Sequence, residues 1–164
     1  MKTLFIGGIK SGKSRLAEAH VLNTPHTSPL YLATSQITDD EMALRIERHK
    51  QQRDTRFTTL EEPLHLERAL ASVNAPVLIE CISMWINNML YHGFDEEAIF
   101  QKLKRLLQQD NEIVFVMNDV GSGIIAGNAL SRRFADINGT AAQRIAASCN
   151  TVYHVIAGIA VRIK

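Results

Sequence analysis

The chain has 164 residues, 46% of them hydrophobic and 21% charged, with a formal net charge of +1. This size and composition predict a single globular domain over residues 1–164, and the small net charge argues against nucleic acid or a membrane surface as its main partner. No apolar run approaches the roughly 20 residues that a membrane-spanning helix needs, and Cys81 and Cys149 lie in apolar stretches where free thiols are expected, so we expect a cytoplasmic protein without membrane insertion.

The chain opens with a strand, a glycine-rich loop and a helix. Residues 2–6 form an apolar, β-prone run, and residues 12–22 are rich in helix formers. The loop between them, Gly7-Gly8-Ile9-Lys10-Ser11-Gly12-Lys13-Ser14, fits the pattern G-x-x-x-x-G-K-[ST]. This order of elements aims backbone N–H groups and a helix N-terminus at an anion. We therefore predict a nucleotide phosphate loop in which Lys13 reaches the β- and γ-phosphates and the Ser14 hydroxyl binds Mg²⁺.

Strands and helices continue to alternate up to residue 81. Asp39 or Thr38 can cap one helix, and Pro63 suits the first turn of another. The run from Pro76 to Cys81 is almost continuously apolar, as in a parallel strand buried on both faces. The predicted elements are a strand at 30–34, a helix at about 40–53, a strand at 57–60, a helix from 63 to about 72 and a strand at 76–81.

The second half of the chain keeps this pattern. It predicts helices at 83–90 and 95–109, a buried strand at 112–117, a glycine loop at 118–123, a mostly helical stretch broken near Asn138-Gly139, and strands at 151–156 and 159–163. Repeated alternation predicts an α/β fold of the P-loop (RecA-like) type, with a mostly parallel sheet, helices on both faces and a C-terminal antiparallel strand. Because such sheets bind ligands at the carboxyl ends of their strands, Thr34, Ser35 and Glu80 join the phosphate loop as candidate site residues.

A phosphate loop usually works with a carboxylate at the end of a second apolar strand, which holds Mg²⁺ directly or through water. Two candidates exist, Glu80 after Val77-Leu78-Ile79 and Asp119 after the strand at 112–117. Strand position favours Glu80. Asp119 is open to a simpler interpretation, a carboxylate that caps its own loop.

The helix predicted at 40–53 carries a third group of candidates. Arg45, His49 and Arg53 are spaced four residues apart and so share one face, with Arg48 and Lys50 adding positive charge. A neutral imidazole between arginines suits attack on a phosphoryl centre, whose charge the guanidinium groups would balance. Spacing alone favours a simpler explanation, an amphipathic surface helix with a solvated basic stripe. The remaining histidines have no such setting and are expected to be surface or core residues: His20, His26, His65, His92 and His154.

Several segments together resemble a known family, the bifunctional adenosylcobinamide kinase / adenosylcobinamide-phosphate guanylyltransferases of the cobalamin pathway. The resemblance runs essentially from end to end of the chain. It rests on the phosphate loop, Tyr31-Leu32-Ala33-Thr34-Ser35, Asp40-Glu41-Met42, Arg45-Ile46-Glu47-Arg48-His49-Lys50, Leu78-Ile79-Glu80-Cys81 with Trp85 and Asn88, Asn118-Asp119-Val120-Gly121-Ser122-Gly123-Ile124, Arg133-Phe134-Ala135-Asp136, and Val155-Ile156-Ala157-Gly158-Ile159. The histidine helix and the second glycine loop are its most specific parts.

The resemblance implies two reactions. A nucleoside triphosphate, ATP or GTP, phosphorylates the aminopropanol hydroxyl of adenosylcobinamide, and GTP then transfers GMP to that phosphate through a guanylylated histidine, which corresponds to His49. Lys13 and Ser14 carry over as triphosphate and Mg²⁺ ligands, and Glu80 as the acidic residue of the second strand, which makes it the favoured second Mg²⁺ ligand. The family also implies a homotrimer. The expected nucleotide-binding residues are Gly7, Gly8, Ile9, Lys10, Ser11, Gly12, Lys13, Ser14, Thr34, Ser35, Arg45, Arg48, Arg53, Glu61 and Glu80.

The sequence departs from the family pattern in three places, and other classes remain alternatives. Asp119 stands where glutamate is usual, Ala126-Gly127-Asn128 replaces a Pro-Glu-Asn segment, and the stretch between Trp85 and Ile113 is shorter than in several relatives. A plain small-molecule kinase would leave the basic stripe around His49 unused. A GTPase switch would need an Asn-Lys-x-Asp segment, which the chain lacks. A nucleotide-sensing module without turnover is a further alternative.

Overall fold

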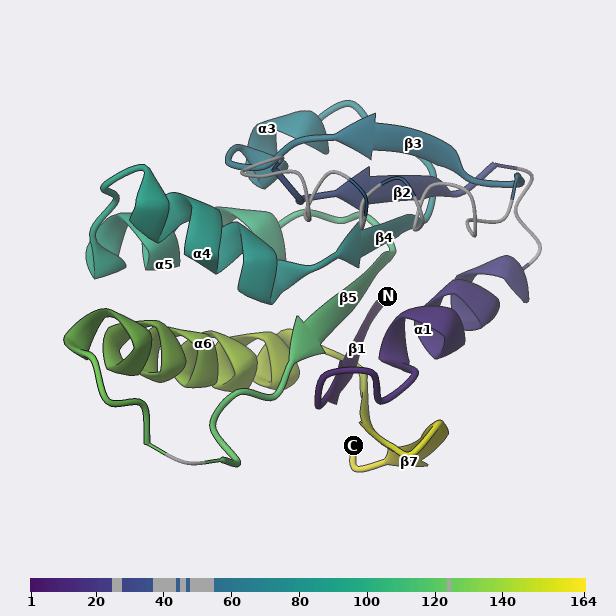
Figure 1. Ribbon diagram of the computed structural model, residues 1–164. Helices are drawn as coiled ribbons and strands as arrows, with labels where there is room; N and C mark the ends of the chain where they lie inside the picture. The colour runs from purple at the N-terminus through teal and green to yellow at the C-terminus, as the bar shows by residue number, and fades with distance from the viewer. Residues whose placement is uncertain (25–27, 37–43, 45–46, 48–54, 124) are drawn as a thin grey trace.

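The computed structural model describes residues 1–24, 28–36, 44, 47, 55–123 and 125–164. Its strands form one sheet in the order β3-β2-β4-β5-β1-β6-β7 (Figure 1). The strands are β1 (Lys2–Gly7), β2 (Leu30–Ala33), β3 (Thr58–Glu61), β4 (Val77–Glu80), β5 (Ile113–Asn118), β6 (Thr151–Ile156) and β7 (Ile159–Arg162). The described helices are α1 (Lys13–Leu22), α3 (Leu66–Ala69), α4 (Ile82–Tyr91), α5 (Glu96–Leu107) and α6 (Ala129–Ser148).

Neighbouring strands run parallel except for β6 and β7, which pair antiparallel through Ile156 and Ile159. β1 lies between β5 and β6, and β5 separates β1 from β4. The parallel arrangement places the carboxyl ends of β1, β2, β4, β5 and β6 along one edge of the sheet. This topology confirms the predicted α/β class with a mostly parallel sheet and a C-terminal antiparallel strand.

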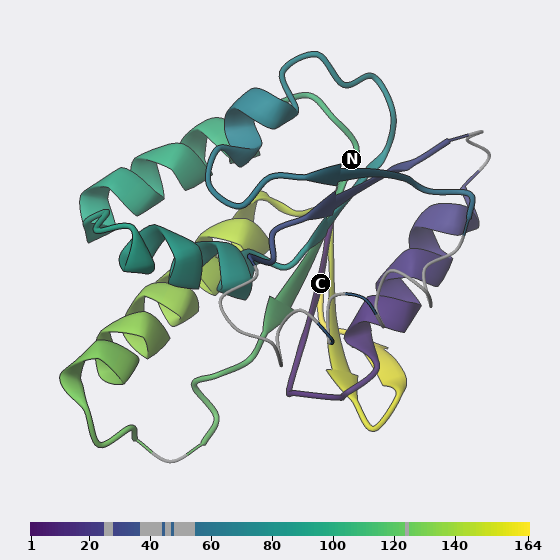
Figure 2. The same cartoon turned by 45° about the horizontal axis from the view of Figure 1, so that its top comes forward.

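Helices cover both faces of the sheet. α1 lies against one face, and α4, α5 and α6 lie on the other (Figures 1 and 2). Successive strand residues therefore enter different cores: Leu4 packs with the α4–α6 layer and Phe5 with α1, and Ile79 and Leu78 divide in the same way. Burial on both faces explains why the β4 and β5 sequences are continuously apolar rather than alternating.

Two of the predicted helices differ from the observed ones. The expected break near Asn138-Gly139 is wrong, because α6 runs without interruption from Ala129 to Ser148. Asn138 is buried there, and its side-chain nitrogen donates to the backbone oxygen of Asn118, 3.0 Å away, so its amide bonds outside its own helix. Gly139 costs an interior helix position about 1 kcal/mol relative to alanine, which the burial of Ile137, Ala141 and Ile145 around it can offset.

The helix predicted from Pro63 to about Ser72 is also wrong in extent, since only Leu66–Ala69 is α-helical. The Glu62 carboxylate accepts hydrogen bonds of 2.8 Å from the N–H groups of Leu64 and His65 and so holds a turn before the helix. Of the helix predicted at 40–53, the structure describes Leu44 and Glu47, and both are helical.

Two other predictions about the chain bear on its environment. Cys81 and Cys149 are buried free thiols, as expected from the sequence. Among the described helices, none combines the length and apolar character needed to cross a bilayer.

Candidate active site

The phosphate loop connects the carboxyl end of β1 to the first turn of α1. Gly12 precedes the helix with a φ of 94°, a left-handed conformation that favours glycine. Lys13, the first helical residue, is only 7% exposed, and its ammonium group donates to the carbonyl oxygen of Gly8, 3.1 Å away. The loop thus curls around a buried lysine at a helix N-terminus, an arrangement suited to polyphosphate.

The loop is also packed against the C-terminal hairpin. A Cβ atom on Gly7 would lie 2.4 Å from the backbone oxygen of Val155 and 2.8 Å from the Ser11 hydroxyl, so only glycine fits there. On the other side, the N–H of Gly158 donates to the carbonyl oxygen of Ser11 at 2.8 Å. The β6–β7 turn therefore packs against the phosphate loop and holds it in place, a role that the sequence alone did not suggest.

Glu80 reaches the helix that follows the phosphate loop. The Ser14 hydroxyl donates to the Glu80 carboxylate at 2.9 Å, although 66 residues separate them along the chain. A hydroxyl and a carboxylate oxygen are the hard ligands that Mg²⁺ prefers, and this ion usually completes its shell with waters and substrate phosphates. The described residues contain no cluster of three or more His, Cys, Asp or Glu side chains placed to hold a metal.

Asp119, the other candidate for Mg²⁺, occupies a different position. Its carboxylate accepts hydrogen bonds from the Ser122 hydroxyl at 2.6 Å and from the N–H of Gly121 at 3.3 Å. This is the loop-capping arrangement that the sequence left open. The Ser14–Glu80 contact makes Glu80 the better Mg²⁺ candidate of the two.

Thr34 connects the ends of β2 and β4. Its side chain is fully buried; the hydroxyl accepts from the N–H of Cys81 at 2.9 Å and lies within hydrogen-bonding distance of the carbonyl oxygens of Glu80 and Cys81. The hydroxyl is therefore occupied by backbone groups, and half-buried Ser35 is the residue that follows it at the sheet edge. Glu61 ends β3 in register with Ala33, which is in turn in register with Glu80, so both carboxylates belong to this edge.

The other predicted site residues divide into two sets. Gly8, Ile9 and Lys10 form the exposed outer side of the phosphate loop, and Ser11 forms its buried inner side. Arg45, Arg48, His49 and Arg53 lie outside the described residues, so the structure adds nothing to their assignment.

Comparison with known proteins decides the family. The model of the family described as "Cobinamide kinase / cobinamide phosphate guanyltransferase" (CobU) matches residues 3–163. The chain belongs to this family. The assignment makes it a transferase that combines a kinase with a nucleotidyltransferase of cobalamin biosynthesis, with nucleotides as substrates.

Relatives in three bacteria match the whole chain. Two proteins named "Bifunctional adenosylcobalamin biosynthesis protein CobU", from Escherichia coli K12 and Salmonella typhimurium LT2, are each 39% identical over 183 aligned positions that span all of both sequences. A "Bifunctional adenosylcobalamin biosynthesis protein CobP" from Pseudomonas aeruginosa is 35% identical over 171 positions, covering 100% of this chain and 98% of the relative. These alignments are longer than the 164 residues of the chain, so they include positions at which the relatives have residues that this chain lacks.

Three polar side chains of α4 hold the backbone around the candidate site, and the sequence alone did not indicate this role. Asn88, which is buried, donates from its side-chain nitrogen to the carbonyl oxygens of Thr34 at 2.7 Å and Pro63 at 3.2 Å. The indole nitrogen of Trp85 donates to the carbonyl oxygen of Leu64 at 3.1 Å, and the Ser83 hydroxyl accepts from the N–H of Asn118 at 2.9 Å. The sequence did contain a signal for this role, because these polar residues lie among the apolar residues of a buried helix, and buried polar groups need hydrogen-bond partners.

Cys81 lies next to Glu80 but is not suited to nucleophilic chemistry. Burial, with the nearby Glu80 carboxylate second, raises the pKa of the Cys81 thiol to about 12. Its sulfur instead accepts the N–H of Met84 at 3.3 Å and so caps α4. A thiol that stays protonated at neutral pH is a poor nucleophile.

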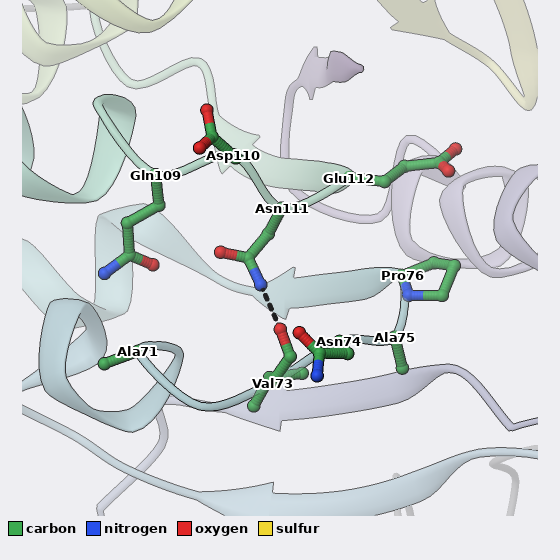
Figure 3. Close-up of a pocket in the computed structure, with 9 residues that line it drawn as sticks. All are labelled: Ala71, Val73, Asn74, Ala75, Pro76, Gln109, Asp110, Asn111 and Glu112. Atoms are coloured by element: carbon green, nitrogen blue, oxygen red, sulfur yellow. Dashed lines mark hydrogen bonds between the residues drawn. The ribbon is translucent and has the colours of Figure 1, made fainter.

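A cavity of about 600 Å³ lies at the opposite edge of the sheet (Figure 3). It is lined by residues that precede the amino ends of β4 and β5, and Asn111 spans it with a 2.6 Å hydrogen bond to the carbonyl oxygen of Val73. Parallel sheets bind substrates at the carboxyl ends of their strands. This cavity is therefore separate from the phosphate loop and contributes nothing to the candidate active site.

Proposed function

We propose that this cobinamide kinase family member phosphorylates the aminopropanol hydroxyl of adenosylcobinamide with ATP or GTP, and then transfers GMP from GTP to the resulting phosphate. The products of the second step are adenosylcobinamide-GDP and pyrophosphate. The Ser14–Glu80 hydrogen bond at the phosphate loop is the observation that supports nucleotide binding and phosphate transfer. Membership of the family supports the corrinoid as the substrate.

In the kinase step the protein acts mainly by positioning and charge. Phosphoryl transfer needs the donor and acceptor oxygens held in line and the charge on the transferring group balanced. The loop amides from Gly8 to Lys13 would hold the triphosphate. The Lys13 ammonium, which donates to Gly8 in this structure, would turn to the β- and γ-phosphates. Ser14 and Glu80 are the residues that would hold Mg²⁺, which neutralises phosphate charge when bound.

In the guanylyl step we assign the nucleophile to His49. An imidazole nitrogen attacks the α-phosphorus of GTP, pyrophosphate leaves, and the phosphate of the corrinoid then takes GMP from the histidine. Arg45, Arg48 and Arg53 would balance the charge on the α-phosphate. Support comes from the family membership and from the four-residue spacing that would put Arg45, His49 and Arg53 on one face of the predicted helix.

We further propose that the 164 residues act as one domain, with a single nucleotide site at the carboxyl edge of the sheet for both steps. Ser35 and Glu61 belong to that edge and would line it, whereas the fully buried Thr34 would hold the backbone beneath it. Lys13→Ala tests the shared site, with exposed Lys104→Ala as its matched control. Loss of both activities in Lys13→Ala supports one site, and loss of the kinase alone would mean two.

We also propose that the protein forms a homotrimer and works in the cytoplasm. The β6–β7 hairpin presents Ile156, Ile159, Val161 and Ile163 with 48–66% of each residue exposed, an apolar strip at a sheet edge of the kind that subunit contacts cover. The free thiols of Cys81 and Cys149 suit a reducing compartment. Mass measurement in solution tests the trimer, and a monomeric mass at working concentration would refute it.

The central experiment on function follows the corrinoid. Purified protein is incubated with adenosylcobinamide, Mg²⁺ and ATP, then with GTP, and the products are identified by mass spectrometry. Successive gains of a phosphoryl group and of GMP are expected. Failure to modify the corrinoid with either nucleotide would overturn the proposal, and phosphorylation without GMP transfer would reduce it to a simple kinase.

A further inference from the structure

The segment that follows β5 lies between the phosphate loop and Glu80. β5 is the strand between β1 and β4, with Gly7 in register with Asn118 and Glu80 in register with Val116. The N–H of Asp119 donates to the carbonyl oxygen of Gly7 at 3.0 Å, so Asp119 is joined directly to the first residue of the phosphate loop. A group at this position is therefore a direct neighbour of the loop in which the triphosphate is proposed to bind.

The Asp119 side chain is held in place and still accessible. Ser122 donates to Oδ2 at 2.6 Å, whereas Oδ1 accepts a longer, 3.3 Å bond from the N–H of Gly121. The His154 ring approaches the same Oδ2 from β6, with Nε2 at 3.8 Å, and the side chains of Asp119 and His154 are 26% and 36% exposed. The bond from Ser122 to Oδ2 thus orients the carboxylate, and Oδ1 can accept a hydrogen bond from a substrate hydroxyl.

The two proposed reactions differ in their need for a base. The acceptor of the kinase step is an alcohol, which must lose a proton as its oxygen bonds to phosphorus. The acceptor of the guanylyl step is a phosphate, and the group that attacks GTP is a neutral imidazole, so neither of those transfers requires a carboxylate base. A base near the phosphate loop would therefore serve the first reaction only.

We propose that Asp119 is the proton acceptor for the corrinoid hydroxyl in the phosphoryl-transfer step; this inference rests on the proposed function. The O–H bond of the alcohol breaks and its oxygen bonds to the γ-phosphorus. The bond from that phosphorus to the β,γ-bridging oxygen breaks, and the nucleoside diphosphate leaves with the electron pair. The proton goes to Oδ1 of Asp119 and from there to solvent, which the partly exposed side chain can reach.

The test compares both activities of the full chain in Asp119→Asn. Asparagine keeps the shape of the side chain and an oxygen for the Gly121 N–H but removes the base. Kinase activity is measured with adenosylcobinamide and Mg²⁺-ATP, and guanylyl transfer with supplied adenosylcobinamide phosphate and GTP. We expect the kinase rate to fall by roughly 100-fold or more, as for a lost general base, and the ratio of kinase to guanylyl transfer to fall by about the same factor, because guanylyl transfer needs no such base.

Asp110→Asn is the matched control, because Asp110 is an exposed aspartate at the opposite end of β5, and its ratio should stay at the wild-type value. Asp119→Glu, which restores a carboxylate, should regain much of the kinase rate. Equal loss of both activities in Asp119→Asn would mean that Asp119 only shapes its loop, and unchanged kinase activity would mean that it is not a base; either result overturns the inference. If the wild-type protein shows neither activity, the proposed function fails instead.

Discussion

The side-chain amide of Asn88 donates a 2.7 Å hydrogen bond to the carbonyl oxygen of Thr34. The same nitrogen reaches the carbonyl oxygen of Pro63 at 3.2 Å, so one amide joins the ends of β2 and β3 to α4. Thr34 in turn bonds to the backbone of Glu80, and Glu80 to the Ser14 hydroxyl. A continuous chain of contacts thus runs from the phosphate loop to the segment after β3.

We expect Asn88→Ala to lower the free energy of unfolding by on the order of 2–3 kcal/mol, because it leaves buried carbonyl oxygens without their donor. Urea unfolding measures the change. Asn87→Ala is the matched control, since Asn87 is the neighbouring residue of the same helix and is exposed, and it should change stability by less than about 0.5 kcal/mol. Equal effects of the two substitutions would contradict a positioning role for Asn88.

The Ser14–Glu80 pair should control the Mg²⁺ requirement. Glu80→Gln and Ser14→Ala each remove a metal-supporting oxygen or its charge, and we expect the Mg²⁺ concentration for half-maximal kinase activity to rise by about 10- to 100-fold, the range typical when such support is lost. Because the two groups touch, the double variant should lose less than the sum of the single losses. Exposed Glu96→Gln serves as control. An unchanged Mg²⁺ dependence in Glu80→Gln would remove this carboxylate from the metal site.

Two adjacent glycines should respond differently to alanine. A Cβ on Gly7 would lie 2.4 Å from the backbone oxygen of Val155, whereas one on Gly8 would meet nothing within 4 Å. Gly7→Ala must move β1 away from β6 and should cost about 1–3 kcal/mol of unfolding free energy. Gly8→Ala should cost less than about 1 kcal/mol in the nucleotide-free protein. Similar losses in urea unfolding would argue against close packing of the loop on the hairpin.

Both thiols should be inert in the folded protein. Burial raises the pKa of Cys81 to about 12 and that of Cys149 to about 11, so at pH 8 the reactive thiolate is a fraction of about 10⁻³ or less of either group. Iodoacetamide at pH 8 should label neither cysteine in the native state and both in urea, as read by mass spectrometry. Rapid native labelling of Cys81 would show that the region around Glu80 opens readily.

The sequence carried enough information for the sheet and the phosphate loop. Strands buried on both faces are continuously apolar, so Val77–Glu80 and Ile113–Asn118 stood out, and the glycine pattern at Gly7–Ser14 requires a specific turn. These signals are local, since each depends on residues close together along the chain. Strand position favoured Glu80 over Asp119 as the Mg²⁺ candidate, and this choice stays a prediction.

The features that the sequence did not reveal depend on partners far away in the chain. Asn138-Gly139 was predicted to break the helix. The hydrogen bond that holds the Asn138 side chain there goes to the backbone of Asn118, 20 residues away, and could not be foreseen from neighbouring residues. The helix after Pro63 begins later than predicted because Glu62 caps a turn there. The support of the phosphate loop by Gly158 depends on the pairing of β6 with β1, which no local pattern reports.

The most direct test of the account uses GTP labelled on either the α- or the γ-phosphate, with Mg²⁺ and the purified protein. We predict protein-bound label from α-labelled GTP only, labile in acid and stable in alkali as a phosphoramidate is. It should be absent in His49→Ala, present in the control His92→Ala, whose histidine is exposed, and removed by adenosylcobinamide phosphate. No α-label on the wild-type protein, with γ-phosphate still passed to adenosylcobinamide, would contradict the account and leave a simple kinase.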